Sequence, residues 1–102
     1  MTTATDTEHE QKDVVKLQPP SMYKVILHND DTTTVDFVIA VLLKIFHRSI
    51  EDAVDITHAI HNKQQAVAGA PYTKEIAEEK ANETKLFARA NNYPLVATFE
   101  EL

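Results

Sequence analysis

Three consecutive polar side chains, Asn29, Asp30 and Asp31, are the group in this chain best suited to chemistry. Their carboxylate and carboxamide oxygens accept hydrogen bonds, and the ionised carboxylates attract cations. Such residues often only turn the chain, because their side chains bond the backbone and they tolerate left-handed conformations. Held rigidly beside an apolar surface, the same oxygens would instead bind a small cation. Both interpretations remain open at this point.

Two histidines, His58 and His61, are three residues apart in a segment with helical periodicity, which is a spacing that metal ligands use. A metal site is nevertheless disfavoured, because the chain has no cysteine and no third histidine at a compatible spacing. The acidic residues near position 30 also lack the glycine and the distal bidentate glutamate of a calcium loop. We therefore predict no metal and no cofactor.

Asp30, His61 and a threonine, either Thr33 or Thr57, contain the groups of a catalytic triad. No nucleophile-elbow or comparable motif surrounds them, so we predict that the protein is not an enzyme. The alternative is a small hydrolase, metal-dependent or based on an Asp/His pair, that uses Asp30 and His61.

The composition narrows the classes of protein and partner. The chain has 102 residues, enough for one domain with a modest core, and a formal net charge of −6 disfavours nucleic acid as a partner. The single glycine excludes a glycine-rich phosphate cradle. We find no signal peptide and no apolar run long enough to span a membrane, so we predict a cytoplasmic protein that does not bind membranes and whose partner is a neutral or cationic peptide.

The polar triplet lies between a strand and a helix. Residues 23–27 are β-branched and aromatic, which predicts a strand, and residues 35–47 are apolar enough for a buried helix capped by Thr33 with Asp36. Ser49 with Asp52 begins a second helix over residues 50–62. Helical spacing predicts an inward stripe on this second helix made of Ile50, Ala53, Val54, Thr57, Ile60 and His61.

The remaining chain predicts two more strands and a third helix. Residues 65–70 form a strand that ends at Gly69 and Pro71, Thr73 caps a helix up to Ala90, and residues 95–99 form the last strand. The order β-α-α-β-α-β gives an α+β fold with three helices on one face of a small sheet. Residues 1–22 are polar and end near a proline pair, so we expect a disordered tail before a domain spanning residues 23–102.

Several motifs together carry a resemblance to a known family. The run from Pro19 to Leu27, followed by the Asn29 to Asp31 triplet and Thr33, closely resembles the ClpS family, adaptors that deliver N-end rule substrates to the AAA+ Clp unfoldase-protease. The resemblance covers essentially residues 19–100 and implies a ClpS-like α/β sandwich with a three-stranded antiparallel sheet. It continues through Phe37-Val38, Ala59-Ile60-His61, Glu75, Ala77 to Lys80, and Tyr93-Pro94-Leu95.

The resemblance implies a site that binds N-degrons, meaning a free α-amino group together with a bulky first side chain such as Leu, Phe, Tyr or Trp. It assigns the α-amino group to Asn29, Asp30 and His61, and the loop and peptide backbone to Asp31 and Thr33. Members of this family often carry methionine where this chain has Val35 and Thr57, so we expect a pocket that tolerates larger aromatic side chains. The implied hydrophobic pocket consists of Leu27, Val35, Val38, Thr57, Ile60 and Leu95.

The resemblance also implies how the adaptor meets its protease. Glu75 and Lys80 would dock on the N-terminal domain of a ClpA- or ClpC-type AAA+ unfoldase, and the N-terminal tail would engage the unfoldase pore. We expect the adaptor to act as a monomer in the bacterial cytoplasm.

Overall fold

The computed structural model describes residues 20–102. The predicted tail over residues 1–22 lies mostly outside the described residues. The elements are β1 (Tyr23–His28), α2 (Val35–Lys44), α3 (Ile50–Lys63), β2 (Gln65–Tyr72), α4 (Lys74–Ala90) and β3 (Val96–Glu101). The predicted order is confirmed. Within the described part of the chain, no helix is both long and apolar enough to cross a membrane.

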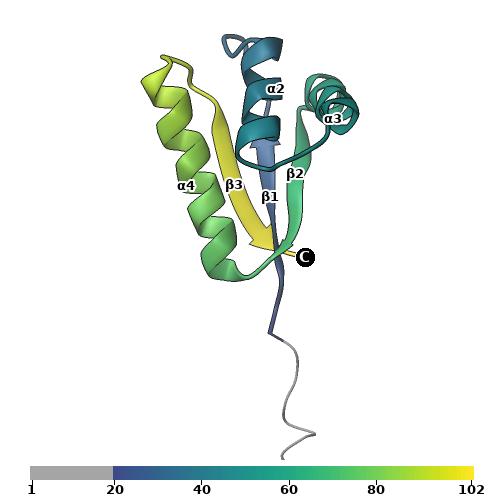
Figure 1. Ribbon diagram of the computed structural model, residues 1–102, viewed down its shortest axis with the longest axis vertical. Helices are drawn as coiled ribbons and strands as arrows, with labels where there is room; N and C mark the ends of the chain where they lie inside the picture. The colour runs from purple at the N-terminus through teal and green to yellow at the C-terminus, as the bar shows by residue number, and fades with distance from the viewer. Residues whose placement is uncertain (1–19) are drawn as a thin grey trace, which may run out of the picture.

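The three strands form one antiparallel sheet in the order β2-β1-β3, so the first strand of the chain is the central one. Figure 1 shows α2 in front of β1, flanked by α3 beside β2 and α4 beside β3. The predicted α+β fold, with three helices on one face of a three-stranded sheet, is confirmed.

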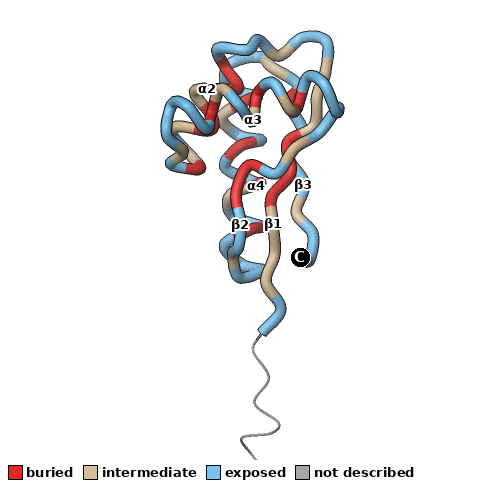
Figure 2. The backbone as a smooth tube through the Cα atoms, turned by 90° about the vertical axis from the view of Figure 1, so that its right-hand side faces the viewer, coloured by how far each residue is buried: buried red, intermediate tan, exposed pale blue. Residues whose placement is uncertain are grey.

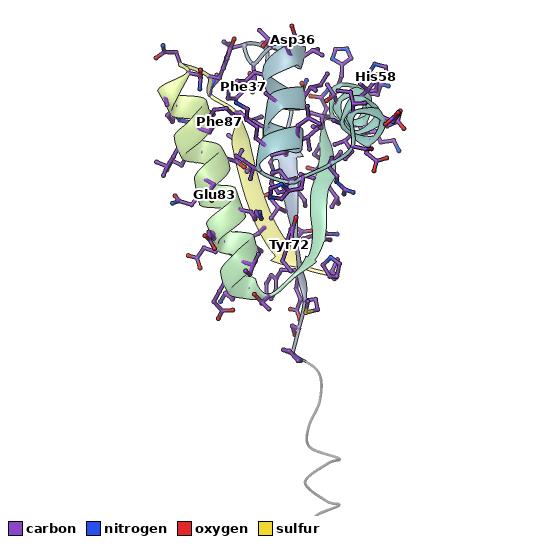
Figure 3. The ribbon with its side chains drawn as sticks, in the orientation of Figure 1. Asp36, Phe37, His58, Tyr72, Glu83 and Phe87 are labelled. Atoms are coloured by element: carbon purple, nitrogen blue, oxygen red, sulfur yellow. The ribbon has the colours of Figure 1, made fainter. Side chains whose placement is uncertain are left out.

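The core lies between the sheet and the three helices. Val25 and Leu27 of β1 are completely buried, and the buried stretches drawn in red in Figure 2 run through β1 and β2. Phe37 on α2 and Phe87 on α4 face each other with ring centroids 5.0 Å apart, which joins the two helices (Figure 3). Such aromatic pairs add stability beyond the apolar area that they bury.

The predicted cap of the first helix was wrong by one residue. Thr34, not Thr33, is the N-cap of α2, and its hydroxyl oxygen accepts a hydrogen bond from the Phe37 amide at 3.2 Å. Thr33 instead belongs to the preceding loop, where its amide and hydroxyl both donate to Asp30. The helix also ends at Lys44 rather than at residue 47, because His47 has a positive φ of 54° that no α-helix continues.

The second strand is longer than predicted, since β2 continues through Pro71 to Tyr72. Pro71 lies on an outer strand, where proline is tolerated because only one side of the strand pairs within the sheet. The pairing of β2 with β1 shifts in register on either side of Val25, and this irregularity accommodates Pro71 within the strand. The last strand begins and ends later than predicted, at Val96 and Glu101.

Helical spacing predicted some buried positions correctly and others wrongly. Thr57 is buried, as predicted, and its hydroxyl donates to the Ala53 carbonyl at 2.7 Å. Ile50, by contrast, is 52% exposed, because it occupies the first helical position at the edge of the fold. His61 is exposed, because it lies in the last turn of α3.

Candidate functional site

A cavity of about 280 Å³ opens where β1 ends, α2 begins and α3 ends. One side is polar and consists of the triplet after β1 together with Thr33 and His61. The other side is mainly apolar and comes from α2 and α3. The full lining is Asn29, Asp30, Asp31, Thr33, Val35, Val38, Thr57, Ile60 and His61.

Asp30 organises the polar side. Its Oδ1 accepts hydrogen bonds from the Thr32 amide at 2.8 Å and the Thr33 amide at 2.7 Å, and its Oδ2 accepts one from the Thr33 hydroxyl at 2.8 Å. Burial raises the pKa of the Asp30 carboxyl, but the bonds from Thr33 and Thr32 and the positive charge of Arg89 outweigh it, so this pKa lies below its ordinary value. Asp30 is therefore ionised at neutral pH and held in one orientation.

Gln64 connects two further polar residues of the site, Asn29 and His61. Its backbone carbonyl accepts from the Asn29 amide at 2.9 Å, and its side chain bonds Asn29 Nδ2 at 3.4 Å and the His61 carbonyl at 3.1 Å. The Asn29 side chain therefore donates through Nδ2, which leaves its Oδ1 without a partner among residues 20–102. Gln64 thus holds both Asn29 and His61 in place, although these two residues are far apart in sequence.

The apolar side has a buried floor and an exposed rim. Val38 and Ile60 are only 6% and 3% exposed, whereas Val35 is 58% exposed. Thr57 belongs to the floor, and its hydroxyl hydrogen is used in the hydrogen bond to the Ala53 carbonyl. The wall that Thr57 contributes is therefore less polar than its residue type suggests.

Two residues of the expected pocket lie elsewhere. Leu27 and Leu95 do not line this cavity and belong to the hydrophobic core, where they are 0% and 1% exposed. Leu27 points from the central strand towards the helices, so it supports the site from behind.

The residues expected to dock the unfoldase are also separate from the cavity. Glu75 is exposed in the first turn of α4, and Lys80 follows on the same helix, where its ammonium group donates to the Ile45 carbonyl at 2.8 Å. Neither residue lines the cavity. Among the described residues, no group of three or more histidine, cysteine, aspartate or glutamate side chains has the arrangement of a metal site.

Sequence reasoning missed two residues that support the site. Gln64 has a positive φ of 73°, and its position directly after a helix, where glycine is common, was the available signal. Arg89 donates through Nη1 to the carbonyls of Tyr93 and Leu95, at 2.9 and 3.1 Å, and its charge acts on Asp30. No local motif marks Arg89, because its effect depends on contacts between α4 and segments distant in sequence.

Comparisons with known proteins all point to one family. Residues 18–98 match the family model described as ATP-dependent Clp protease adaptor protein ClpS. The chain is similar to the ClpS adapter of Lawsonia intracellularis, with 45% identity over 85% of this chain and 79% of that protein. It is also similar to the ClpS adapter of Clostridium acetobutylicum, with 42% identity over 100% of both chains.

One solved structure is similar in fold as well as in sequence. The structure of Agrobacterium tumefaciens ClpS2 bound to L-phenylalaninamide has a TM-score of 0.78 and 33% identity, over 82% of this chain and all of that one. The residues that match the family model include every residue that lines the cavity. The chain therefore belongs to the ClpS family of ATP-dependent Clp protease adaptor proteins.

Proposed function

We propose that this adaptor binds the free α-amino group and the bulky apolar first residue of a polypeptide and delivers that polypeptide to the Clp unfoldase-protease for degradation. The observation that carries the proposal is the two-sided cavity, in which oriented oxygen acceptors lie beside a buried apolar floor. A protonated terminal amine attached to an apolar side chain is the ligand whose two halves match these two sides.

The polar side suits an ammonium group. A terminal α-amino group has a pKa near 8, so at neutral pH it is mostly a cation with three hydrogen-bond donors. We assign these donors to Asn29 Oδ1, the Asp30 carboxylate and the His61 side chain, directly or through water. Each charge-assisted bond contributes about 1.5 to 3 kcal/mol. Asp31 and Thr33 would hold the loop and the first peptide groups.

The apolar side suits one large side chain. Burying a leucine- or phenylalanine-sized group contributes about 1.5 to 3 kcal/mol, too little alone to overcome the cost of association. The solved relative bound to L-phenylalaninamide supports this proposal, because that ligand combines a free α-amine with a benzyl side chain. We infer that first residues Leu, Phe, Tyr and Trp are accepted.

Val35 and Thr57 would set the upper size of that side chain. Both line the cavity and are shorter than the methionine expected at these positions, so we expect more room at the rim and floor. We expect Trp-first peptides to bind about as well as Leu-first peptides, with weaker rejection of Ile. Undetectable binding of Ile-first peptides, combined with much weaker binding of Trp-first than of Leu-first peptides, would contradict this expectation.

We further propose that Glu75 and Lys80 contact the N-terminal domain of a ClpA- or ClpC-type unfoldase, and that the adaptor acts as a monomer in the cytoplasm. Both residues lie on α4, outside the degron cavity, so substrate and unfoldase would bind at the same time. The family comprises adaptors and not enzymes, so the alternative of a hydrolase built on Asp30 and His61 is not retained.

Fluorescence anisotropy with labelled peptides tests the proposal. A Leu-first peptide with a free amine should bind, and the same peptide with Gly as its first residue should bind at least about tenfold more weakly, since it loses the buried side chain. Equal binding of the two peptides would contradict the proposed use of the apolar floor. Mass spectrometry of the recovered peptide checks that it stays intact.

A further inference from the structure

A second hollow, of about 670 Å³, lies between α4 and the outer strand β3. Its apolar floor comes from Val96, Ala97 and Phe99 of β3, from Leu95 directly before this strand and from Ala81 of α4. None of the residues that line the degron cavity belongs to it. It is therefore a distinct surface, which the proposed function does not use apart from Glu75 at one end.

The register of the sheet fixes which backbone groups of β3 face this side. The Leu102 amide donates to the Met22 carbonyl at 2.9 Å, which makes these two residues a hydrogen-bonded pair. Such pairs alternate along antiparallel strands, so Val96, Thr98 and Glu100 direct their amides and carbonyls towards β1. The backbone groups of Ala97, Phe99 and Glu101 consequently point outward.

These outward groups form an open sheet edge. Within residues 20–102, β3 pairs only with β1, so its outer edge has no strand partner. The Leu95 carbonyl lies next to this edge and already accepts a hydrogen bond from Arg89 at 3.1 Å. The unpaired outward backbone groups are therefore those of β3 itself. Open edges of this kind recognise extended peptides through backbone hydrogen bonds, while adjacent hollows select side chains.

The charges along the hollow are separated. Helix α4 runs antiparallel to β3, so the start of α4 lies beside the end of β3 (Figure 1). Glu75, Glu78 and Glu79 therefore line the end nearest Glu101. Lys85 and Arg89 line the opposite end. An acidic end and a basic end give the surface a direction.

We propose that the edge of β3 binds an extended segment of a partner protein, which adds to the sheet as a fourth strand antiparallel to β3. The N-terminal part of an antiparallel strand would lie at the Glu101 end, so we infer that this part carries lysine or arginine. Small or β-branched apolar residues at alternate positions would fill the floor beside Ala81 and Ala97. Recognition would not need a free α-amino group.

The probe is the acetylated peptide Ac-Lys-Arg-Val-Thr-Val-Thr-Val-NH₂, added to the full chain at low protein concentration. Its blocked terminus prevents capture by the degron cavity. Amide hydrogen exchange followed by NMR should show protection appearing at Ala97, Phe99 and Glu101, whose amides point outward, with no change at Val96 and Thr98, whose amides already bond β1. The reversed sequence, Ac-Val-Thr-Val-Thr-Val-Arg-Lys-NH₂, is the matched control and should bind more weakly.

Charge reversal supplies a second test. The double variant Glu78→Lys and Glu79→Lys should weaken binding of the probe about tenfold, because each exposed ion pair contributes little and two are reversed. Glu83→Lys is the control, since Glu83 is on α4 but does not line this hollow (Figure 3). Both variants should bind a Phe-first peptide as before, which shows that they are folded.

Three results would overturn the proposal. The first is outward amides that are already protected in the free protein, which would mean that another segment of the chain or a second copy covers the edge. The second is saturating probe with no new protection at Ala97, Phe99 and Glu101. The third is a loss of binding free energy per reversed charge that is equal for the double variant and for Glu83→Lys, which would reduce the effect to net charge.

Discussion

Replacing Asp30 by asparagine removes the charge at the centre of the site while keeping the shape of the side chain. The carboxylate accepts three hydrogen bonds, from the Thr32 amide and from the Thr33 amide and hydroxyl, at 2.7 to 2.8 Å. The asparagine oxygen can still accept from the two amides, and the Thr33 hydroxyl can rotate to accept from the new NH₂ group. We therefore expect the loop to keep its conformation.

The structure allows two magnitudes to be estimated for Asp30→Asn. A charge-assisted hydrogen bond contributes about 1 kcal/mol more than a neutral one, and Asp30 is partly exposed, so the free energy of unfolding should fall by about 1 to 2 kcal/mol. Binding loses one charge-assisted bond to the ammonium group, about 1.5 to 3 kcal/mol, which weakens Kd by a factor of roughly 10 to 150.

Anisotropy with a free-amine Phe-first peptide measures the binding loss, and urea denaturation measures the stability loss. Asp36→Asn is the matched control, because Asp36 is an exposed residue in the first turn of α2, labelled in Figure 3, and does not line the cavity. It should leave Kd within about twofold, as expected for a surface substitution away from the site. Unchanged Kd in folded Asp30→Asn would refute the assignment of Asp30 to the amine.

Three further predictions concern the support of the site and the sheet. Gln64→Gly relieves the positive φ of 73° but removes the side chain that bonds Asn29, so we expect weaker peptide binding with an unchanged or higher Tm; a parallel loss of both would contradict this. Gly69→Ala places a Cβ against the Tyr72 hydroxyl oxygen and 2.9 Å from its Cζ, which should lower the free energy of unfolding by about 1 to 3 kcal/mol in urea denaturation; unchanged stability would contradict this. The pKa of Asp30 is lowered in the folded state, so its stabilisation is present above the unfolded pKa near 3.9 and is lost as pH falls through the lower folded value. The stability difference between the native protein and Asp30→Asn should thus be constant above about pH 5 and shrink below about pH 4, and a difference that stays constant down to pH 2 would refute it.

Local patterns predicted the elements well, because each carries its own signal. Ser49 and Thr73 cap their helices as predicted, with hydroxyl oxygens that accept from amides three residues on, at 3.1 and 3.2 Å. Thr33 and Thr34 are both possible caps by residue type, and the structure uses Thr34, while the Thr33 amide and hydroxyl donate to Asp30. Sequence spacing cannot decide such a competition between neighbouring polar groups.

The site was predictable where adjacent residues form it and less so where it depends on tertiary contacts. The triplet after β1 and the α3 residues Thr57, Ile60 and His61 were expected to line one cavity, and they do. Leu95, expected in the pocket, lies in the core, because its depth depends on how β3 docks beneath α4. Contacts of this kind have no local pattern in the sequence.

The measurement that tests the central claim most directly compares one peptide in two forms. A labelled Phe-first peptide is titrated with the native protein at pH 7, once with a free terminal amine and once acetylated. The account predicts saturable binding of the free form and at least about 100-fold weaker binding of the acetylated form, because acetylation removes the charge and two of the three donors. Equal affinity for the two forms would contradict it.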